Sequence, residues 1–280
     1  MRRTTQLRQL LSQGRLLVSP FTYDAFTAKI AEAVGFPIVY MSGFGTSMSR
    51  GYPDVGLLTM SEMVENARRI ALTVSVPVIA DADTGYGNPL NAARTVREYE
   101  QAGVAGVHLE DQVFPKKCGF FEGKQVIPME EHIAKLRAAM DARTDPDFLI
   151  IARTDALAVN GWDDTLRRCR AYHKSGADMV FIDGIKTRED LELYARELRD
   201  IPRLYNGDLA STQEVERLGF KVMIHRGSML AVYKAVRGVM EELKQKGVVD
   251  KARYATREEV AGLLGLDKVY EMEKRYTAVG

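Results

Sequence analysis

The chain has 280 residues, 46% of them hydrophobic, and a formal net charge of +1 at pH 7. This length and apolar content suit one large α/β domain or two smaller ones. Lysine and arginine are spread along the chain, which argues against nucleic acid as a partner. No apolar run reaches the length of a membrane span and the N-terminus lacks a signal-peptide pattern, so we expect a cytoplasmic protein that binds no membrane.

Short β-branched runs alternate with amphipathic helical stretches along the chain. The eight predicted strands are, in order, RLLVSP, PIVYMSG, VPVIADAD, GVHLED, FLIIARTD, MVFIDG, PRLYNGD and FKVMIHR. The predicted helices cover residues 24–34, 61–74, 91–102, 129–142, 163–175, 188–198, 212–218 and 228–245. Several of them end at a glycine, which suits the left-handed position after a helix.

Eight strand–helix units predict an α/β protein in which residues 1–245 form a (β/α)8 barrel. An open doubly wound sheet fits less well, because no glycine-rich phosphate fingerprint follows the first strand. Residues 246–280 predict one or two further helices, which would pack on the barrel or on a neighbouring subunit. This surplus of helices predicts a homo-oligomer.

Carboxylates follow the predicted strands at the end where a parallel barrel carries its active site. Asp81 and Asp83 end the third strand on one face, and Glu110 ends the fourth strand. Each acid alone could cap a helix or pair with a basic residue, but three together repel unless a cation or proton lies among them. Oxygen ligands without a histidine cluster favour Mg²⁺, or Mn²⁺, over zinc. Asp54 could join them through water, or be an ordinary turn residue.

Two further features of the strand ends point to an anionic ligand. Arg153 ends the fifth strand, where its planar fork could grip a carboxylate or form a structural ion pair with Asp155 or Glu110. The segment MSGFGTSMSRG after the second strand could bring backbone N–H groups close to an anionic oxygen, or be a plain loop.

The two cysteines are too few for a disulfide framework, so we expect thiols in a reducing compartment. Cys169 falls in a helical pattern and is expected to be structural. Cys118 lies in a loop beside Lys116 and Lys117, which would lower the pKa of its thiol. Taken alone, it could also be an inert loop thiol.

Together these motifs resemble the isocitrate lyase and phosphoenolpyruvate mutase superfamily. The closest resemblance is to its short members, the methylisocitrate and 2,3-dimethylmalate lyases and carboxyphosphonoenolpyruvate mutase. It is carried by SPFTYDAFTAKIAEAVGFPIVYMSG, PVIADADTGYGNPLNAARTVREYEQAGVAGVHLEDQVFPKKCG and IARTDALAV. The resemblance implies a (β/α)8 barrel with Mg²⁺. It also implies a homotetramer, a dimer of dimers, that swaps the eighth helix between neighbours.

The resemblance also implies roles for individual residues. The metal would be held, directly or through water, by Asp81, Asp83 and Glu110, with Asp54 nearby. The substrate would be contacted by Tyr40, Ser42, Gly43, Gly119, Phe120, Arg153, Asp183 and Asn206. Cys118 would be the general acid–base on a mobile loop, assisted by Arg153 and Lys116.

The chain departs from the family pattern at several of these positions. Phe120 stands where the family lyases usually have His, and Asp183 stands where they have Glu, one methylene longer. Asn206 fits the pattern of the seventh strand. His225 and Arg226 replace the usual end of the eighth strand and could contact substrate or form a surface pair.

The first expectation is therefore a Mg²⁺-dependent carbon–carbon lyase. It would cleave a 2-hydroxy di- or tricarboxylate of the alkylmalate or methylisocitrate type into a 2-oxoacid and a second carboxylate, through an enolate-like intermediate. The enzymatic alternatives are phosphoenolpyruvate or carboxyphosphonoenolpyruvate mutase, phosphonopyruvate hydrolase, or oxaloacetate decarboxylase or hydrolase chemistry. The alternative of another class is an oxoacid-binding protein that has lost turnover.

Overall fold

A computed structural model of the chain describes residues 1–119 and 121–277. Eight parallel strands close into a barrel in sequence order. The strands are β1 (Leu17–Thr22), β2 (Val39–Met41), β3 (Val78–Asp81), β4 (Gly106–Glu110), β5 (Leu149–Thr154), β6 (Met179–Ile182), β7 (Arg203–Asn206) and β8 (Val222–His225). The predicted (β/α)8 barrel is confirmed.

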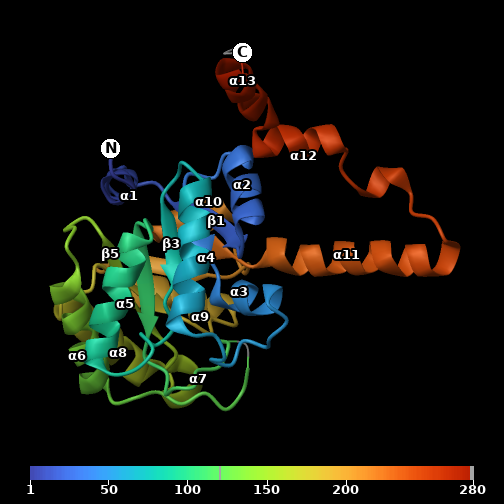
Figure 1. Ribbon diagram of the computed structural model, residues 1–280. Coiled ribbons are helices and arrows are strands. Elements are labelled where there is room, and N and C mark those ends of the chain that lie inside the picture. Colours follow the sequence, from blue (N-terminus) through green and yellow to red (C-terminus); the bar gives the residue numbers. More distant parts are fainter. Residues whose placement is uncertain (120, 278–280) are drawn as a thin grey trace. The chain divides into compact units, whose positions relative to one another are not determined.

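Helices follow the strands and surround the barrel (Figure 1). Those of the barrel region are α1 (Arg3–Ser12), α2 (Ala25–Val34), α3 (Gly43–Ser49), α4 (Met60–Thr73), α5 (Pro89–Gln101), α6 (Met129–Ala142), α7 (Leu157–Asn160), α8 (Trp162–Lys174), α9 (Arg188–Glu197) and α10 (Thr212–Arg217). The remaining elements are α11 (Gly227–Lys246), the 3₁₀ turn η1 (Lys251–Arg253), α12 (Arg257–Leu264) and α13 (Leu266–Thr277). All eight predicted helices are present, and the sequence did not reveal α1, α3 and α7.

Several helices begin at side chains that satisfy the N–H groups of a first turn. Before α4, the hydroxyl of Thr59 accepts from the Glu62 N–H, and the Glu62 carboxylate accepts from the Thr59 N–H. Before α5, the Asn88 side chain accepts from the Asn91 N–H, and Pro89 occupies the first helical position. These caps fix the loops that leave the carboxyl ends of the strands, where the acidic residues lie.

The strand register places charged and polar residues opposite one another at these ends. Asp81 of β3 pairs with His108 of β4, and Glu110 of β4 pairs with Arg153 of β5. All six residues of β5 are buried, as expected for a strand covered on both faces. The barrel therefore carries buried ionisable groups on adjacent strands within an apolar frame.

Contacts group the chain into two compact units, Met1–Gly227 and Ser228–Gly280. The first unit holds all eight strands with α1 to α10, and the second holds nearly all of α11, with η1, α12 and α13. Within the second unit, Arg253 donates to Glu242 over 3.0 Å. The boundary between residues 245 and 246 and the helix swap stay predictions. Across the described part of the chain, no helix combines the length and apolar character that a bilayer crossing requires.

Candidate active site

The acids predicted at the third and fourth strands lie together in the barrel mouth. Asp81, Asp83 and Glu110 are all buried. The Gly43 N–H donates to Asp81 Oδ2 over 3.1 Å, and the Asp83 N–H donates to Asp81 Oδ1 over 3.0 Å. Asp83 has a φ of 48°, in the left-handed region that aspartate tolerates better than most residues. Two backbone N–H groups therefore fix the carboxylate of Asp81.

Lys116 reaches into these acids from the loop that follows β4. Its Nζ lies 2.6 Å from Asp54 Oδ1 and 2.9 Å from Asp83 Oδ1. Burial raises the pKa of Asp83 to about 6, an effect that Lys116 opposes and Asp81 and Asp54 reinforce. Burial disfavours the charge of Lys116, but Asp83, Glu110 and Asp54 outweigh it and raise the lysine pKa well above its ordinary value. Asp54 thus belongs to a buried ion-pair group.

Glu110 is the least satisfied acid of the group. It is fully buried, and neither of its carboxylate oxygens has a hydrogen-bond partner within residues 1–119 and 121–277. Arg153 Nε lies 3.2 Å from Glu110 Oε2. Burial raises the pKa of Glu110 well above its ordinary value, although Arg153 opposes the shift. Glu110 is therefore held by an ion pair, without a hydrogen bond from the described part of the chain.

The donor chemistry of these acids suits a hard divalent cation, as the sequence predicts. Among the residues that the structure describes, however, no group of three or more His, Cys, Asp or Glu side chains is placed to hold a metal ion. Asp83 is paired with Lys116 instead, and Glu110 with Arg153. The Glu110 oxygens accept no hydrogen bond from the described residues and can serve a further cation, so the acids fit Mg²⁺ by chemistry and burial.

Arg153 forms the structural ion pairs that the sequence left open as an alternative to substrate binding. Its Nε lies 2.9 Å from Asp155 Oδ2, and its Nη2 lies 3.1 Å from Asp155 Oδ1. Nη2 also lies 3.3 Å from Asp183 Oδ2. Burial opposes ionisation of Asp155, but Arg153 and Lys124 outweigh it and lower the aspartate pKa. The guanidinium is thus held in one orientation at the barrel mouth.

His108 is a residue of the site that the sequence analysis did not single out. Its Nε2 lies 2.8 Å from the Tyr40 hydroxyl and 3.6 Å from Asp81 Oδ1. Burial lowers the pKa of His108 to about 4, although Asp81 opposes the shift. His108 is therefore a neutral link between Tyr40 and Asp81. The sequence could have indicated His108, because it lies two residues before Glu110 on β4 and residues at this spacing share one face of a strand.

Ser42 and Gly43, predicted to contact substrate, lie at the start of α3. Ser42 Oγ accepts from the Gly45 N–H over 3.2 Å, so this hydroxyl caps the helix. The Gly43 N–H is directed at Asp81, and a Cβ at this position would lie 2.5 Å from Asp81 Oδ2. The absence of a side chain at Gly43 therefore permits its close approach to the acid.

The loop of residues 111–128 holds Cys118 against the barrel mouth. Gln112 and Val126 form an antiparallel bridge at its base. The Cys118 N–H donates to the Asp54 carbonyl over 2.9 Å, and Cys118 is 4% exposed. The predicted acid–base thiol is thus buried close to the predicted metal ligands.

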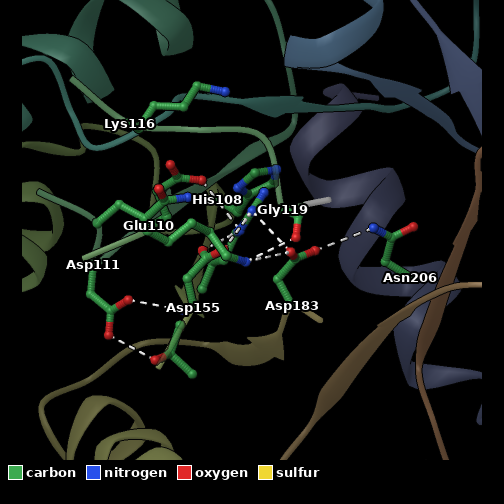
Figure 2. Close-up of polar contacts among 12 residues, drawn as sticks. His108, Glu110, Asp111, Lys116, Gly119, Asp155, Asp183 and Asn206 are labelled. Carbon is green, nitrogen blue, oxygen red and sulfur yellow. Dashed lines mark hydrogen bonds and ion pairs between the residues drawn. The ribbon is translucent and has the colours of Figure 1, made fainter. Parts of the chain in front are cut away.

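Gly119 packs its backbone onto the end of β6. A Cβ there would lie 1.8 Å from Asp183 Oδ2, so a side chain cannot be accommodated in this arrangement (Figure 2). Asn206 Nδ2 donates to Asp183 Oδ1 over 3.4 Å. A cavity of ≈ 200 Å³ adjoins these three residues and Arg226. Phe120 lies outside the described residues, so its predicted contact with substrate stays a prediction.

The end of β8 carries local contacts. The Gly227 N–H donates to His225 Nδ1 over 3.1 Å, and Arg226 Nη2 lies 3.6 Å from Asp208 Oδ2. The first contact is local to the turn, and the second reaches Asp208 in the loop after β7. They favour the surface-pair alternative for His225, while Arg226 also lines the cavity.

Asp111 is a second residue that the sequence analysis did not identify. It is fully buried and accepts from the hydroxyls of Thr154 (2.7 Å) and Tyr172 (2.8 Å), the Asp155 N–H (3.0 Å) and Arg168 Nη1 (3.1 Å). Asp111 therefore joins the ends of β4 and β5 to α8 and supports Asp155, which in turn holds Arg153. The sequence could have indicated Asp111 only by its position directly after Glu110.

Comparison with known proteins identifies the group to which this barrel belongs. Residues 7–244 match the family described as phosphoenolpyruvate phosphomutase. The chain belongs to this family. It is 42% identical over 287 residues to the 2,3-dimethylmalate lyase of Eubacterium barkeri, a match that covers 99% of each protein.

Solved structures of the phosphoenolpyruvate phosphomutase family agree with the fold. One, a 2,3-dimethylmalate lyase described as a PEP mutase/isocitrate lyase superfamily member, has a TM-score of 0.92 at 35% identity, covering 100% of this chain and 96% of that one. Another, phosphonopyruvate hydrolase in complex with oxalate and Mg++, has a TM-score of 0.91 at 32% identity, covering 99% of this chain and 100% of that one. The chain is therefore an enzyme of the superfamily that contains these lyases and mutases.

Proposed function

We propose that the chain is a Mg²⁺-dependent carbon–carbon lyase in the cytoplasm. Its substrate is a 2-hydroxy di- or tricarboxylate of the alkylmalate or methylisocitrate type, and its products are a 2-oxoacid and a second carboxylate. One observation carries the proposal: the buried Cys118 is anchored through its N–H to the Asp54 carbonyl, beside Lys116 and the acids. A thiol in such a position is suited to exchange a proton with carbon near neutral pH.

The metal in this proposal lies among Asp81, Asp83 and Glu110, directly or through water, with Asp54 nearby. The unpartnered oxygens of Glu110 support it, as does a relative solved with oxalate and Mg++. When bound, the cation, Mg²⁺ or Mn²⁺, stabilises negative charge on the oxygens of the oxoacid. Lys116 assists by balancing the charge of Asp54 and Asp83.

The remaining residues bind and orient the substrate in this proposal. Arg153, held by Asp155, grips one carboxylate of the substrate. Asp183 and Asn206 contact each other beside the cavity and bind the second functional group of the substrate. The other proposed contacts are Tyr40, Ser42, Gly43, Gly119 and Phe120.

The bond cleaved is C2–C3 of the 2-hydroxyacid. Its electron pair passes to C3 as an enolate-like anion, and Cys118 gives the thiol proton to C3. The C2 hydroxyl loses its proton as C2 becomes the carbonyl of the oxoacid. That proton returns to the thiolate through solvent, so atoms and charge balance over one turnover.

A second candidate is hydrolysis of a phosphonate, favoured by the similarity to phosphonopyruvate hydrolase over nearly the whole chain. The same acids and Arg153 would bind the oxoacid part, and water would attack phosphorus. The products separate the two candidates, because the lyase releases two carboxylates and the hydrolase releases inorganic phosphate.

The assembly proposed for the enzyme is a homotetramer, a dimer of dimers that swaps α11. Exposed apolar side chains on α11 support it, because such side chains are usually covered by another surface. They are Leu230, Val232, Tyr233, Val236, Met240 and Leu243.

The decisive test is Cys118→Ser, assayed by coupled detection of pyruvate from 2,3-dimethylmalate and 2-methylisocitrate. Because the hydroxyl is a much weaker acid than the thiol, we expect kcat to fall by about a hundredfold or more. Calorimetry should show unchanged binding of Mg²⁺ and oxalate. Near-wild-type turnover of the variant would rule out the acid–base role of Cys118.

A further inference from the structure

Lys124 links the loop that carries Cys118 to the barrel. Its ammonium group donates to the Gly119 carbonyl over 3.0 Å and to Asp155 Oδ1 over 2.9 Å, and lies 3.7 Å from Asp183 Oδ2. The side chain is only 3% exposed. An ammonium group has three donors, and three oxygens surround this one. Lys124 is thus a buried residue whose charge is balanced by carboxylates, and not a solvated surface lysine.

These contacts join two parts of the molecule. Gly119 directly follows Cys118 in the loop, whereas Asp155 and Asp183 follow β5 and β6 of the barrel. The loop is attached to the barrel on its other side by the Cys118 N–H and by Lys116, both of which contact Asp54. The peptide that carries the thiol is therefore held from two sides.

We infer that Lys124 is a positioning residue: it acts as a latch that ties the Gly119 peptide to Asp155 and Asp183 and so holds the Cys118 thiol in place. The effect of Lys124 on catalysis rests on the proposed role of Cys118. Its effect on the position of the loop does not depend on that role. The latch consists of the ammonium group bridging the Gly119 carbonyl and the carboxylates of Asp155 and Asp183.

Lys117 provides a matched control within the same loop. Its Nζ donates to the Gly123 carbonyl over 3.0 Å and to the Glu122 carbonyl over 3.4 Å, in exposed surroundings. Both partners belong to the loop, and among the described residues this ammonium group contacts no barrel carboxylate. Lys117→Met therefore removes the same charge without removing a link to the barrel.

The test measures how fast iodoacetamide alkylates each cysteine in the native full-length enzyme, by peptide mass spectrometry. In wild type Cys118 is 4% exposed and Cys169 is fully buried, so both should react slowly. Because a buried ion pair is lost, Lys124→Met should accelerate alkylation of Cys118 about tenfold or more. Lys117→Met, which removes an exposed charge, should stay within about twofold of wild type.

Two features make the acceleration specific to loop opening. Removal of a nearby positive charge by itself lowers the thiolate fraction and slows alkylation, which is the opposite sign. Cys169 lies in the core of the barrel unit and reports unfolding in the same sample. If Lys124→Met exposes both thiols, Lys124→Gln decides, because it keeps a donor for the Gly119 carbonyl but loses the ion pairs. A Cys118 rate unchanged in Lys124→Gln overturns the latch.

Turnover separates the latch from the proposed function. With both correct, Lys124→Met lowers kcat in the pyruvate assay about tenfold or more, in parallel with faster alkylation of Cys118. Faster alkylation with wild-type turnover upholds the latch and counts against the acid–base role of Cys118. Lower turnover with unchanged alkylation overturns the latch and leaves the proposed function standing.

Discussion

Glu110 and Asp111 are adjacent, both carboxylates and both fully buried, yet their surroundings are opposite. Asp111 accepts hydrogen bonds from four groups, whereas neither oxygen of Glu110 accepts one from the part of the chain that the structure describes. A buried acid with every oxygen satisfied stabilises the scaffold, and one without donors costs free energy that a ligand can repay. The comparison assigns Asp111 to the framework and Glu110 to the ligand site (Figure 2).

The sharpest test of this comparison is Glu110→Gln. Burial raises the pKa of Glu110 and so favours its uncharged form, which the amide resembles. The amide gives up only the ion pair with Arg153, which keeps Asp155 and Asp183 as partners, so we expect the free energy of unfolding to change by only about 1 kcal/mol or less. Loss of a metal ligand should lower kcat/KM by roughly a hundred- to a thousandfold.

Calorimetric titration with Mg²⁺ and oxalate, beside urea denaturation without metal, measures both effects in one variant. Large destabilisation with unchanged Mg²⁺ binding would reverse the assignment of Glu110.

The matched variant Asp111→Asn should behave in the opposite way. An amide nitrogen would face donors that now point at a carboxylate oxygen, and Arg168 would lose Asp111, the fully buried one of its two acidic partners. We expect the free energy of unfolding to fall by about 2 to 4 kcal/mol. Mg²⁺ affinity should change far less than in Glu110→Gln.

Urea denaturation of both variants, side by side, checks this difference. Asp111→Asn with wild-type stability would mean that the four hydrogen bonds do not hold the strand ends together.

Much of the fold could be predicted from local pattern. The alternation of β-branched runs and amphipathic stretches specified eight units, and helix α6 has the same bounds as predicted, residues 129–142. The burial of Asp81, Asp83 and Glu110 followed from the topology, because parallel strands bring their carboxyl ends to one rim. Both ion-pair partners considered for Arg153, Asp155 and Glu110, are also present.

The contacts that position the site could not be predicted in this way. Lys124 and Asp155 are 31 residues apart, and their contact depends on the path of an irregular loop. The distinction between Glu110 and Asp111 likewise depends on which donors α8 and β5 present, and the sequence shows only two adjacent acids. Lys116 was expected beside the thiol, whereas in the structure its ammonium group pairs with Asp54 and Asp83.

His132 gives the smallest effect and tests whether an unsatisfied buried group always marks a ligand site. It is fully buried, and neither ring nitrogen has a partner among the described residues. Its ring packs edge-on against the ring of Tyr172, with 4.7 Å between the ring centroids. The hydroxyl of Tyr172 donates to Asp111, so His132 lies beside the framework acid. Burial, with Lys135 and Arg168 nearby, lowers its pKa to about 3. The neutral ring costs little, so we assign His132 to the framework, with a penalty that appears only in acid.

The sign of that penalty follows from the lowered pKa. The unfolded chain takes up a proton near the ordinary histidine pKa of 6.5, while folded His132 does so only near pH 3. The stability contributed by neutral His132 is therefore present above pH 6.5 and is lost as the pH falls toward 3. Between pH 7 and 5 the loss amounts to roughly 1 to 2 kcal/mol. The pKa of His108 is also lowered, so His108 adds a separate loss of stability in acid, which a variant at position 132 would share with the wild type.

His132→Leu should therefore flatten, but not abolish, the fall in stability between pH 7 and pH 5. Urea denaturation of wild type and variant at both values isolates the His132 part, because His108 is common to both. An identical pH dependence in the two proteins would show that His132 titrates normally in the fold. The distinction between framework and ligand-site residues would then rest on Glu110 and Asp111 alone. Of these two acids, only Glu110 is expected to change Mg²⁺ binding when it is replaced.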